Sequence, residues 1–485
     1  MNASQQDRSI YETAIEDRIS FIQKIIYGLG SLCNNLLAAS LGCMAIVLNL
    51  GLGMNPALIG AIMSLSRLTD ALTDPIMGYV SDHTRSRWGR RRPYIFSGAI
   101  LAGLIFALMW QIPSGHSERF YFWVFLIGTN IFYIAYTIFA TPFIALGYEL
   151  TPDYHERTRL MGFSNFIGQF AWMAVPWFYA IMENDRLFDN SVQGAKGLAI
   201  AVGAIVVVVG ALPAIFFKER YQSIVQREEK GKVFRGLLTN ITEFFKSFLI
   251  TIRFRPFLKL CAATFLVFNG FMMVSGFGSY VIIYYLYGGN KDLGATLMGW
   301  FGTVSSICTF CVIALITWLS TKIGKRKAFF VSTSISIVGY ALKWFCYNPA
   351  KPLMLLIPAP LIAFGLGGLF TLVGAMMADV CDLDELENGH RREGMFGAIY
   401  WWVVKLGMAL AFALSGYLLN ATGFDVALGN AQAPKTLLLL RAFDVGIPIV
   451  ASALAIWAIA SYKITEAKAH SIRQELELRR GKAAA

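Results

Sequence analysis

The sequence predicts an all-α membrane protein in which twelve transmembrane helices form two parallel six-helix bundles. Hydrophobic residues make up 56% of the 485 residues and charged residues only 15%, whereas soluble chains carry about 25% charged residues. Twelve stretches are mainly apolar over the ~20 residues that a spanning helix needs. The second half of the chain also repeats the charge pattern of the first. This composition excludes a disordered chain and a soluble nucleic-acid-binding domain.

The candidate spans fall into two sets of six. The first set covers about 25–50, 57–80, 93–112, 120–147, 160–182 and 197–217, and the second covers about 257–287, 294–319, 328–347, 352–378, 394–419 and 440–462. We therefore expect four regions, namely an N-terminal bundle over 1–217, a cytoplasmic linker over 218–256, a C-terminal bundle over 257–462 and a cytoplasmic tail over 463–485.

The N-terminal residues 1–20 are polar and of mixed charge, and they lack the apolar core of a cleaved signal peptide. The first apolar stretch is too long to be such a core, so we expect it to remain in the chain as a spanning helix.

Lysines and arginines gather in alternate loops. They follow span two (Arg85 to Arg92), fill the central segment and follow span eight, whereas the loop after span one has none and the loop after span three has only Arg119. Because basic loops stay inside, we expect a plasma-membrane (bacterial inner-membrane) protein with both termini in the cytoplasm. The net charge of +12 is then a topology signal.

The central segment contains an amphipathic pattern between Phe234 and Ile252, with apolar residues at helical spacing and basic residues between them. One interpretation is a helix that lies on the inner membrane surface and links the two bundles. The other is a helix that binds a partner or regulates the protein.

The two halves of the chain repeat each other. Gly89-Arg90-Arg91-Arg92 follows span two, and Gly324-Lys325-Arg326-Lys327 follows span eight; acidic and basic runs follow spans four and ten. Repeats in the same orientation predict a duplication about an axis along the membrane normal. This is the arrangement of the major facilitator fold, whose substrates bind near the midplane between the halves.

Span two contains two carboxylates, which are costly inside a membrane. Asp70 and Asp74 are four residues apart and share a helical face, Thr73 lies near that face, and Pro75 can free a backbone carbonyl. Oxygen ligands of this kind suit a hard cation such as Na⁺. Alternatively, the two carboxylates share a proton, or Asp74 only braces the end of the helix.

Two lysines lie within the second set of spans. Lys405 has apolar neighbours on both sides in span eleven, so we expect it to pair with Asp70 or Asp74. This pair would be structural, or it would exchange with a transported cation. Lys343 lies near the outer end of span nine, where snorkelling to the membrane surface explains it.

Other polar or aromatic residues within spans could contact a substrate or join helices. They are Tyr27, Asn34 and Asn35 in span one, Thr141 in span four, Asn165 and Gln169 in span five, and Trp401 in span eleven. No Ser-His-Asp set, metal site or nucleotide-binding loop can be assembled from the sequence. We therefore expect neither an enzyme nor a bound cofactor.

Several segments of the chain together resemble the glycoside–pentoside–hexuronide:cation symporter family. They are Asp70-Ala71-Leu72-Thr73-Asp74-Pro75-Ile76-Met77-Gly78, the basic loop after it, Ala378–Asp382, Arg392–Phe396 and Lys405. The resemblance covers nearly the whole chain and implies coupling to Na⁺, Li⁺ or H⁺. It implies a cation site at Asp70 and Asp74 with Thr137 nearby, and a charge-exchange role for Lys405. Charged sugar-binding positions of the family correspond here to Asn35, Ala140 and the region of Asn165.

We therefore expect a symporter that imports a glycoside or similar sugar with Na⁺ or H⁺. Its expected partners are that substrate, the coupling cation and membrane lipids, and not a nucleic acid. The alternatives are a carrier of lysolipids or other amphiphiles, and a sensor or membrane enzyme in a transporter fold. On the cytoplasmic side, we expect the basic residues Arg90, Arg91 and Arg92 to pair with carboxylates and close the gate. The candidate carboxylates are Asp82, Asp379, Asp382 and Glu393.

Overall fold

The computed structural model describes residues 17–84, 86–113, 115–151, 154–219, 251, 253–388 and 393–480, and the regular structure within them is helical. The chain divides into two compact units. The first comprises residues 1–54 and 69–241, and the second comprises 55–68 and 242–485. The helix α4 (Pro56–His83) contributes to both units.

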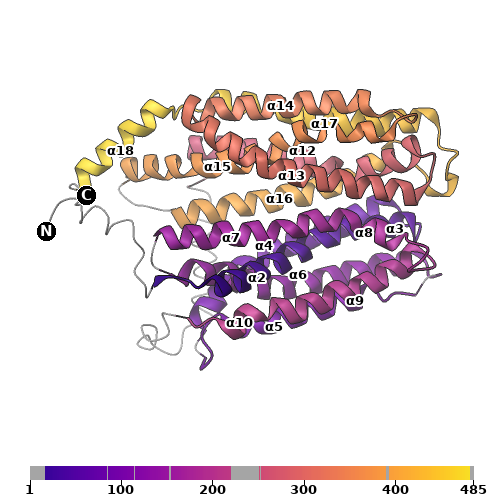
Figure 1. The fold of residues 1–485 in the computed structure, drawn as a ribbon, viewed down its shortest axis with the longest axis horizontal. Helices are drawn as coiled ribbons and strands as arrows, with labels where there is room; N and C mark the ends of the chain where they lie inside the picture. The colour runs from indigo at the N-terminus through magenta and orange to yellow at the C-terminus, as the bar shows by residue number, and fades with distance from the viewer. Residues whose placement is uncertain are drawn as a thin grey trace. The chain divides into compact units, whose positions relative to one another are not determined.

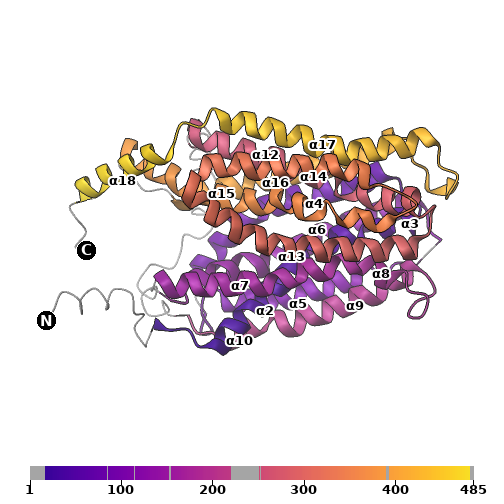
Figure 2. The ribbon, with the colours of Figure 1, turned by 45° about the horizontal axis from the view of Figure 1, so that its top comes forward.

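Long helices that run side by side build the first unit (Figures 1 and 2). They are α2 (Phe21–Met44), α3 (Ile46–Leu50), most of α4, α5 (Arg92–Met109), α6 (Glu118–Glu149), α7 (Tyr154–Ala174), α8 (Phe178–Met182), α9 (Ser191–Gly210) and α10 (Leu212–Phe216). The helix α2 packs on α7, and α5 packs on α6 and α9. A Cβ on Gly103 would lie 2.6 Å from the backbone oxygen of Gly203, so small residues allow α5 and α9 to cross closely.

The second unit is built in the same way. Its elements are α12 (Arg255–Tyr280), a π-helical turn η5 (Val281–Leu286), α13 (Lys291–Ile323), α14 (Lys325–Cys346), η6 (Pro352–Leu356), α15 (Ala359–Asn388), α16 (Glu393–Ala421), α17 (Pro434–Ala460), α18 (Glu466–Arg480) and the start of α4. The helix α12 packs on α16 and α17, and α14 packs on α15. Within this unit a Cβ on Gly60 of α4 would lie 2.6 Å from the backbone oxygen of Phe412 on α16.

The expected spans correspond to helices in the described part of the chain. Ten helical segments there are long and apolar enough to cross a membrane. The helices α4 and α7 supply the second and fifth spans, but their charged and polar residues lower their hydropathy, and they are not among those ten. The amphipathic linker pattern over 234–252 lies outside the described residues, except for Thr251. The domain limits at 217, 256 and 462 stay predictions.

Candidate functional site

Two neighbouring helices of the first unit, α4 and α6, present a ladder of oxygen atoms to each other. The hydroxyl of Thr137 donates to Oδ1 of Asp70 over 3.2 Å, and it lies 3.1 Å from the hydroxyl of Thr73. One turn further along, the hydroxyl of Thr141 donates to Oδ1 of Asp74 over 3.2 Å. We call Asp70, Thr73, Asp74, Thr137 and Thr141 the carboxylate–threonine cluster.

The local sequence explains how the two helices meet in this register. Asp70 and Asp74 are spaced four residues apart on α4, and Thr137 and Thr141 have the same spacing on α6, so each helix presents one face to the other. Each helix also contains a proline directly after this segment, Pro75 on α4 and Pro142 on α6. A proline lacks the N–H that would bond a carbonyl one turn earlier, so each helix can free a carbonyl oxygen here.

The cluster differs in burial along its length. Asp70 is fully buried and Thr137 is 1% exposed, whereas Asp74 is half-buried. Carboxylate and hydroxyl oxygens are the ligands that hard cations prefer. Two carboxylates one helical turn apart can also hold a proton between them, because each charge disfavours the other. The arrangement therefore has the ligand chemistry of a Na⁺ or H⁺ site, and its occupation by either stays a prediction.

The ladder includes residues that the sequence did not single out. The hydroxyl of Thr69 donates to Oδ1 of Asn130, and Nδ2 of Asn130 donates to the Leu126 carbonyl over 2.7 Å. Asn130 lies seven residues before Thr137, on the same face of α6, and this spacing is the signal that would have found it. Arg67, one turn before Asp70 on α4, is also buried.

The substrate candidates of the first unit lie mainly where α2 meets α6 and α7. Tyr27 is 2% exposed and stacks on Phe143 with 4.7 Å between ring centroids, so it contributes to helix packing. Nδ2 of Asn35 donates to the Gly168 carbonyl of α7 over 3.1 Å. Asn34 differs from these, because its Oδ1 is buried and accepts no hydrogen bond from the described residues. A buried oxygen of this kind is available to accept a hydrogen bond from a ligand hydroxyl.

Two further candidates lie on α7. Asn165 is exposed and Gln169 is half-buried. They are four residues apart and therefore share a face of that helix.

In the second unit, α16 contains Trp401 and Lys405. Trp401 is 54% exposed, and its ring is stacked on Phe370 with 6.2 Å between centroids. Lys405 is half-buried. Its exchange with a cation at the aspartates stays a prediction. Sequence reasoning missed Asn269 of α12, which is 6% exposed, makes no side-chain hydrogen bond to the described residues and packs against Gly407 of α16.

The snorkelling interpretation of Lys343 is wrong. Its Nζ lies 2.7 Å from Oδ2 of Asp444 on α17, and the two side chains are 9% and 3% exposed. The Tyr347 hydroxyl donates to the same oxygen over 2.6 Å. The lysine has no need to reach the membrane surface, because its charge is neutralised inside the unit.

The expected gating residues form separate networks in the two units. In the first, Nη2 of Arg91 lies 2.7 Å from Oδ1 of Asp82, and both Arg90 and Arg91 pair with Glu149. Burial lowers the pKa of Arg90, but the hydrogen bond to Glu149 and the nearby carboxylates outweigh it and raise that pKa above its ordinary value.

In the second unit Asp379 accepts from Nζ of Lys325 over 2.7 Å, and Asp382 is half-buried on the same helix, α15. Sequence reasoning placed Asp379 opposite the arginines and did not consider a partner from its own repeat.

The two networks are built on the same plan, which extends the internal repeat. Gly89 and Gly324 have φ of +108° and +82°, a conformation that favours glycine. Oε1 of Glu219 accepts from the backbone N–H groups of Arg91 and Arg92 over 2.8 and 3.0 Å, beside Gly89. At the corresponding place in the second unit, a Cβ on Gly324 would lie 3.0 Å from Oε2 of Glu466.

Comparisons with known proteins agree with these features. The profile of the family described as MFS/sugar transport protein matches residues 21–466. The isoprimeverose transporter of Lactiplantibacillus pentosus is 24% identical over 417 residues, which cover 85% of this chain and 82% of the relative. The sodium-dependent lysophosphatidylcholine symporter 1-B of Danio rerio is 23% identical over 96% of this chain and 91% of the relative. A crystal structure of a D-xylose–proton symporter superposes with a TM-score of 0.61 at 14% sequence identity, and the match covers 91% of this chain and 98% of that one. The two proteins therefore share the fold.

Proposed function

Because this chain belongs to the MFS/sugar transport family, and within it to the glycoside–pentoside–hexuronide:cation symporters, we propose that it imports a glycoside or oligosaccharide together with Na⁺ or H⁺. The chain is a transporter of the major facilitator fold and not an enzyme. The single observation that supports cation coupling best is the carboxylate–threonine cluster, because it gathers two carboxylates and three hydroxyls between α4 and α6.

The cluster suggests how binding and transport are linked. A cation at Asp70 and Asp74 would neutralise charges that are costly within a membrane and would draw the carboxylates from any competing positive charge. We propose that Lys405 is that competing charge. By linkage, a substrate that binds more tightly when the cation is present must tighten cation binding by the same factor. The two halves would then rock around a site near the midplane.

Orientation follows from the basic loops. The Arg90–Arg92 and Lys325–Lys327 segments lie at the same end of corresponding helices in the two repeats. We propose that this end faces the cytoplasm of a bacterial cell, with both chain termini on the same side. The protein would then lie in the inner membrane with Asp70 reached from outside or inside in alternation.

A carrier of lysolipids is the second candidate, and the relative from Danio rerio supports it, since its name specifies a sodium-dependent lysophosphatidylcholine symporter. The polar residues of α2 favour the sugar. Asn34 offers a buried oxygen without a hydrogen-bond donor among the described residues, which suits a hydroxylated ligand better than an acyl chain.

Ligand-induced thermal stabilisation of the purified protein tests both candidates. A panel of glycosides, oligosaccharides and lysophospholipids would be compared with and without Na⁺, and at two pH values. We expect stabilisation by a sugar that increases with Na⁺ or with protons. Stabilisation by lysophospholipids alone would favour the second candidate, and stabilisation by a sugar without any cation effect would contradict coupling.

A further inference from the structure

Four basic side chains gather at one end of α12, α14 and α17, outside the transport site. They are Arg255, Lys259, Arg326 and Lys463, which we call the basic cluster. The charges of Lys463, Arg255 and Arg326 all act on the ammonium of Lys259. Nζ of Lys259 donates to the Ser461 carbonyl, and Nη2 of Arg326 donates to the Ala460 carbonyl, so the cluster surrounds the end of α17.

The cluster has an excess of positive charge. No residue of the basic cluster forms an ion pair with a carboxylate in the described part of the chain. Nε of Arg326 is buried and makes no hydrogen bond to the described residues. Arg255 and Lys463 are exposed. Like charges held this close repel each other, so an anion that binds among them would be stabilised.

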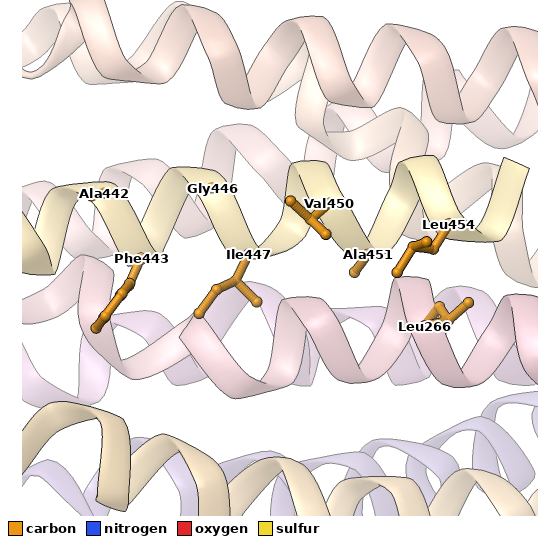
Figure 3. A pocket seen from close by; sticks show the side chains of 8 residues that line it. All are labelled: Leu266, Ala442, Phe443, Gly446, Ile447, Val450, Ala451 and Leu454. Atoms are coloured by element: carbon orange, nitrogen blue, oxygen red, sulfur yellow. The ribbon is translucent and has the colours of Figure 1, made fainter. Parts of the chain in front are cut away.

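An apolar groove of about 350 Å³ runs along the same two helices, α12 and α17 (Figure 3). The lining side chains are Leu266, Ala442, Phe443, Gly446, Ile447, Val450, Ala451 and Leu454. A Cβ on Gly270 would lie 2.6 Å from Cβ of Ala451, so the helices are in close contact there. Val450 is 59% exposed and Leu454 is 46% exposed, which makes this a surface groove.

The groove leads toward the basic cluster. Leu266 lies seven residues after Lys259 on α12, and Leu454 lies seven residues before Ser461 at the end of α17. Seven residues of helix rise ~10 Å, and they return to nearly the same face. A charged end and an apolar groove are therefore aligned at a separation that one amphiphilic molecule can bridge.

We propose that this surface binds an anionic phospholipid of the cytoplasmic leaflet, with its headgroup at the basic cluster and an acyl chain along Leu266, Val450 and Leu454. The leaflet rests on the orientation proposed above. Basic pockets between transmembrane helices on the cytoplasmic side bind anionic headgroups. The groove offers an acyl chain direct packing against apolar side chains, which would fix the position of the lipid beside the basic cluster. A soluble anion would use the cluster but leave the groove without a role.

Native tryptophan fluorescence can report the occupant directly. Trp457 lies three residues after Leu454 on α17 and is 76% exposed. The purified protein in detergent would be titrated with phosphatidylglycerol or phosphatidylcholine that is brominated on one acyl chain. The quenching specific to Trp457 is the difference between the parent protein and a Trp457→Phe variant. We expect phosphatidylglycerol to quench at a concentration about 25-fold lower.

The variants distinguish headgroup recognition at the basic cluster from misfolding and from the loss of a positive charge elsewhere on the protein. Arg255→Gln with Lys463→Gln changes two exposed side chains and should remove the preference, since each basic residue contributes about fivefold. Lys322→Gln, an exposed lysine of α13 outside the cluster, should keep it. Glycerol phosphate without chains should compete only weakly.

Three results would overturn the proposal, namely equal quenching by the two lipids, equal loss in Lys322→Gln, or full competition by glycerol phosphate. None of these readouts uses transport, so the lipid site and the proposed transport function can fail separately.

Discussion

Two sites of buried carboxylate charge, one in each unit, are surrounded differently. In the first unit Asp70 and Asp74 accept from threonine hydroxyls over 3.2 Å. In the second, Asp444 accepts from Lys343 over 2.7 Å and from the Tyr347 phenol over 2.6 Å. The threonine hydroxyls place further oxygen atoms beside Asp70 and Asp74, whereas Lys343 forms a direct ion pair with Asp444.

We propose that this difference separates a cation-binding site from a structural anchor. Lys343 and Asp444 are buried together as an ion pair, and the loss of either would leave the other charge buried without its partner. Carboxylates supplied with hydroxyl oxygens offer further ligands to an incoming cation. We therefore propose that the carboxylate–threonine cluster is the cation site and that the pair of Lys343 and Asp444 contributes to stability.

The largest expected effect concerns the carboxylate–threonine cluster. Asp70→Asn should lower cation-dependent uptake at least about a hundredfold, because it removes a charge that a bound ion needs, while the protein remains folded. Uptake into proteoliposomes and size-exclusion profiles measure the two properties. Asp444→Asn is the matched control. It should fold poorly, and the protein that does fold should keep its cation-dependent uptake. Full cation-dependent uptake in Asp70→Asn would remove the assignment.

The second effect concerns the anchor. Lys343→Ala leaves Asp444 buried without its cation and should destabilise the second unit by about 3–5 kcal/mol. Thermal unfolding and expression level measure this loss. Lys343→Met combined with Asp444→Leu should recover most of the stability, since it removes both charges together. If the double variant proved as unstable as the single one, the pair would have a role beyond mutual neutralisation.

A smaller effect is expected within the carboxylate–threonine cluster. Thr137→Val removes the hydroxyl that reaches both Asp70 and Thr73, and should weaken cation binding about tenfold, which corresponds to ~1.4 kcal/mol. Thr137→Ser retains the hydroxyl and should stay close to the parent protein. Cation titrations of both variants check this. An equal loss in the serine variant would indicate packing.

The smallest effect tests whether Lys405 acts on the aspartates. Lys405→Ala should leave cation affinity unchanged or raise it a few-fold, while coupled accumulation of substrate falls. A double-mutant cycle with Asp74→Ala, measured on cation binding and on expression, should show coupling between the two positions. Strictly additive effects would rule out the proposed exchange of charge.

The sequence predicted features that depend on spacing within one helix. Asp70, Thr73 and Asp74 could be placed on one face of α4, and their chemistry predicted a cation site, because helical periodicity is local. The repeat of glycine and basic residues predicted the duplicated fold. The helical spans could be located because each must be long and apolar.

Features that depend on contacts between distant segments were not predictable in this way. Lys343 and Asp444 lie on different helices, and no spacing rule joins them, so Lys343 was interpreted as a snorkelling lysine. The spacing from Thr137 places Asn130 on the face of the cluster, but its hydrogen bond with Thr69 becomes visible only when α4 and α6 are packed together. Glu219 and Glu466 reach back to the glycines before α5 and α14 for the same reason.

Direct cation binding to the purified protein, without substrate, tests the central claim best. Na⁺ would be titrated calorimetrically at pH 8, and proton release on Na⁺ addition would be followed in weakly buffered solution. We predict saturable Na⁺ binding or a titrating proton in the parent protein and in the folded fraction of the Asp444→Asn variant. The double variant Asp70→Asn with Asp74→Asn should lose both signals. Identical Na⁺ and proton binding in the parent and in that double variant would contradict the cation site.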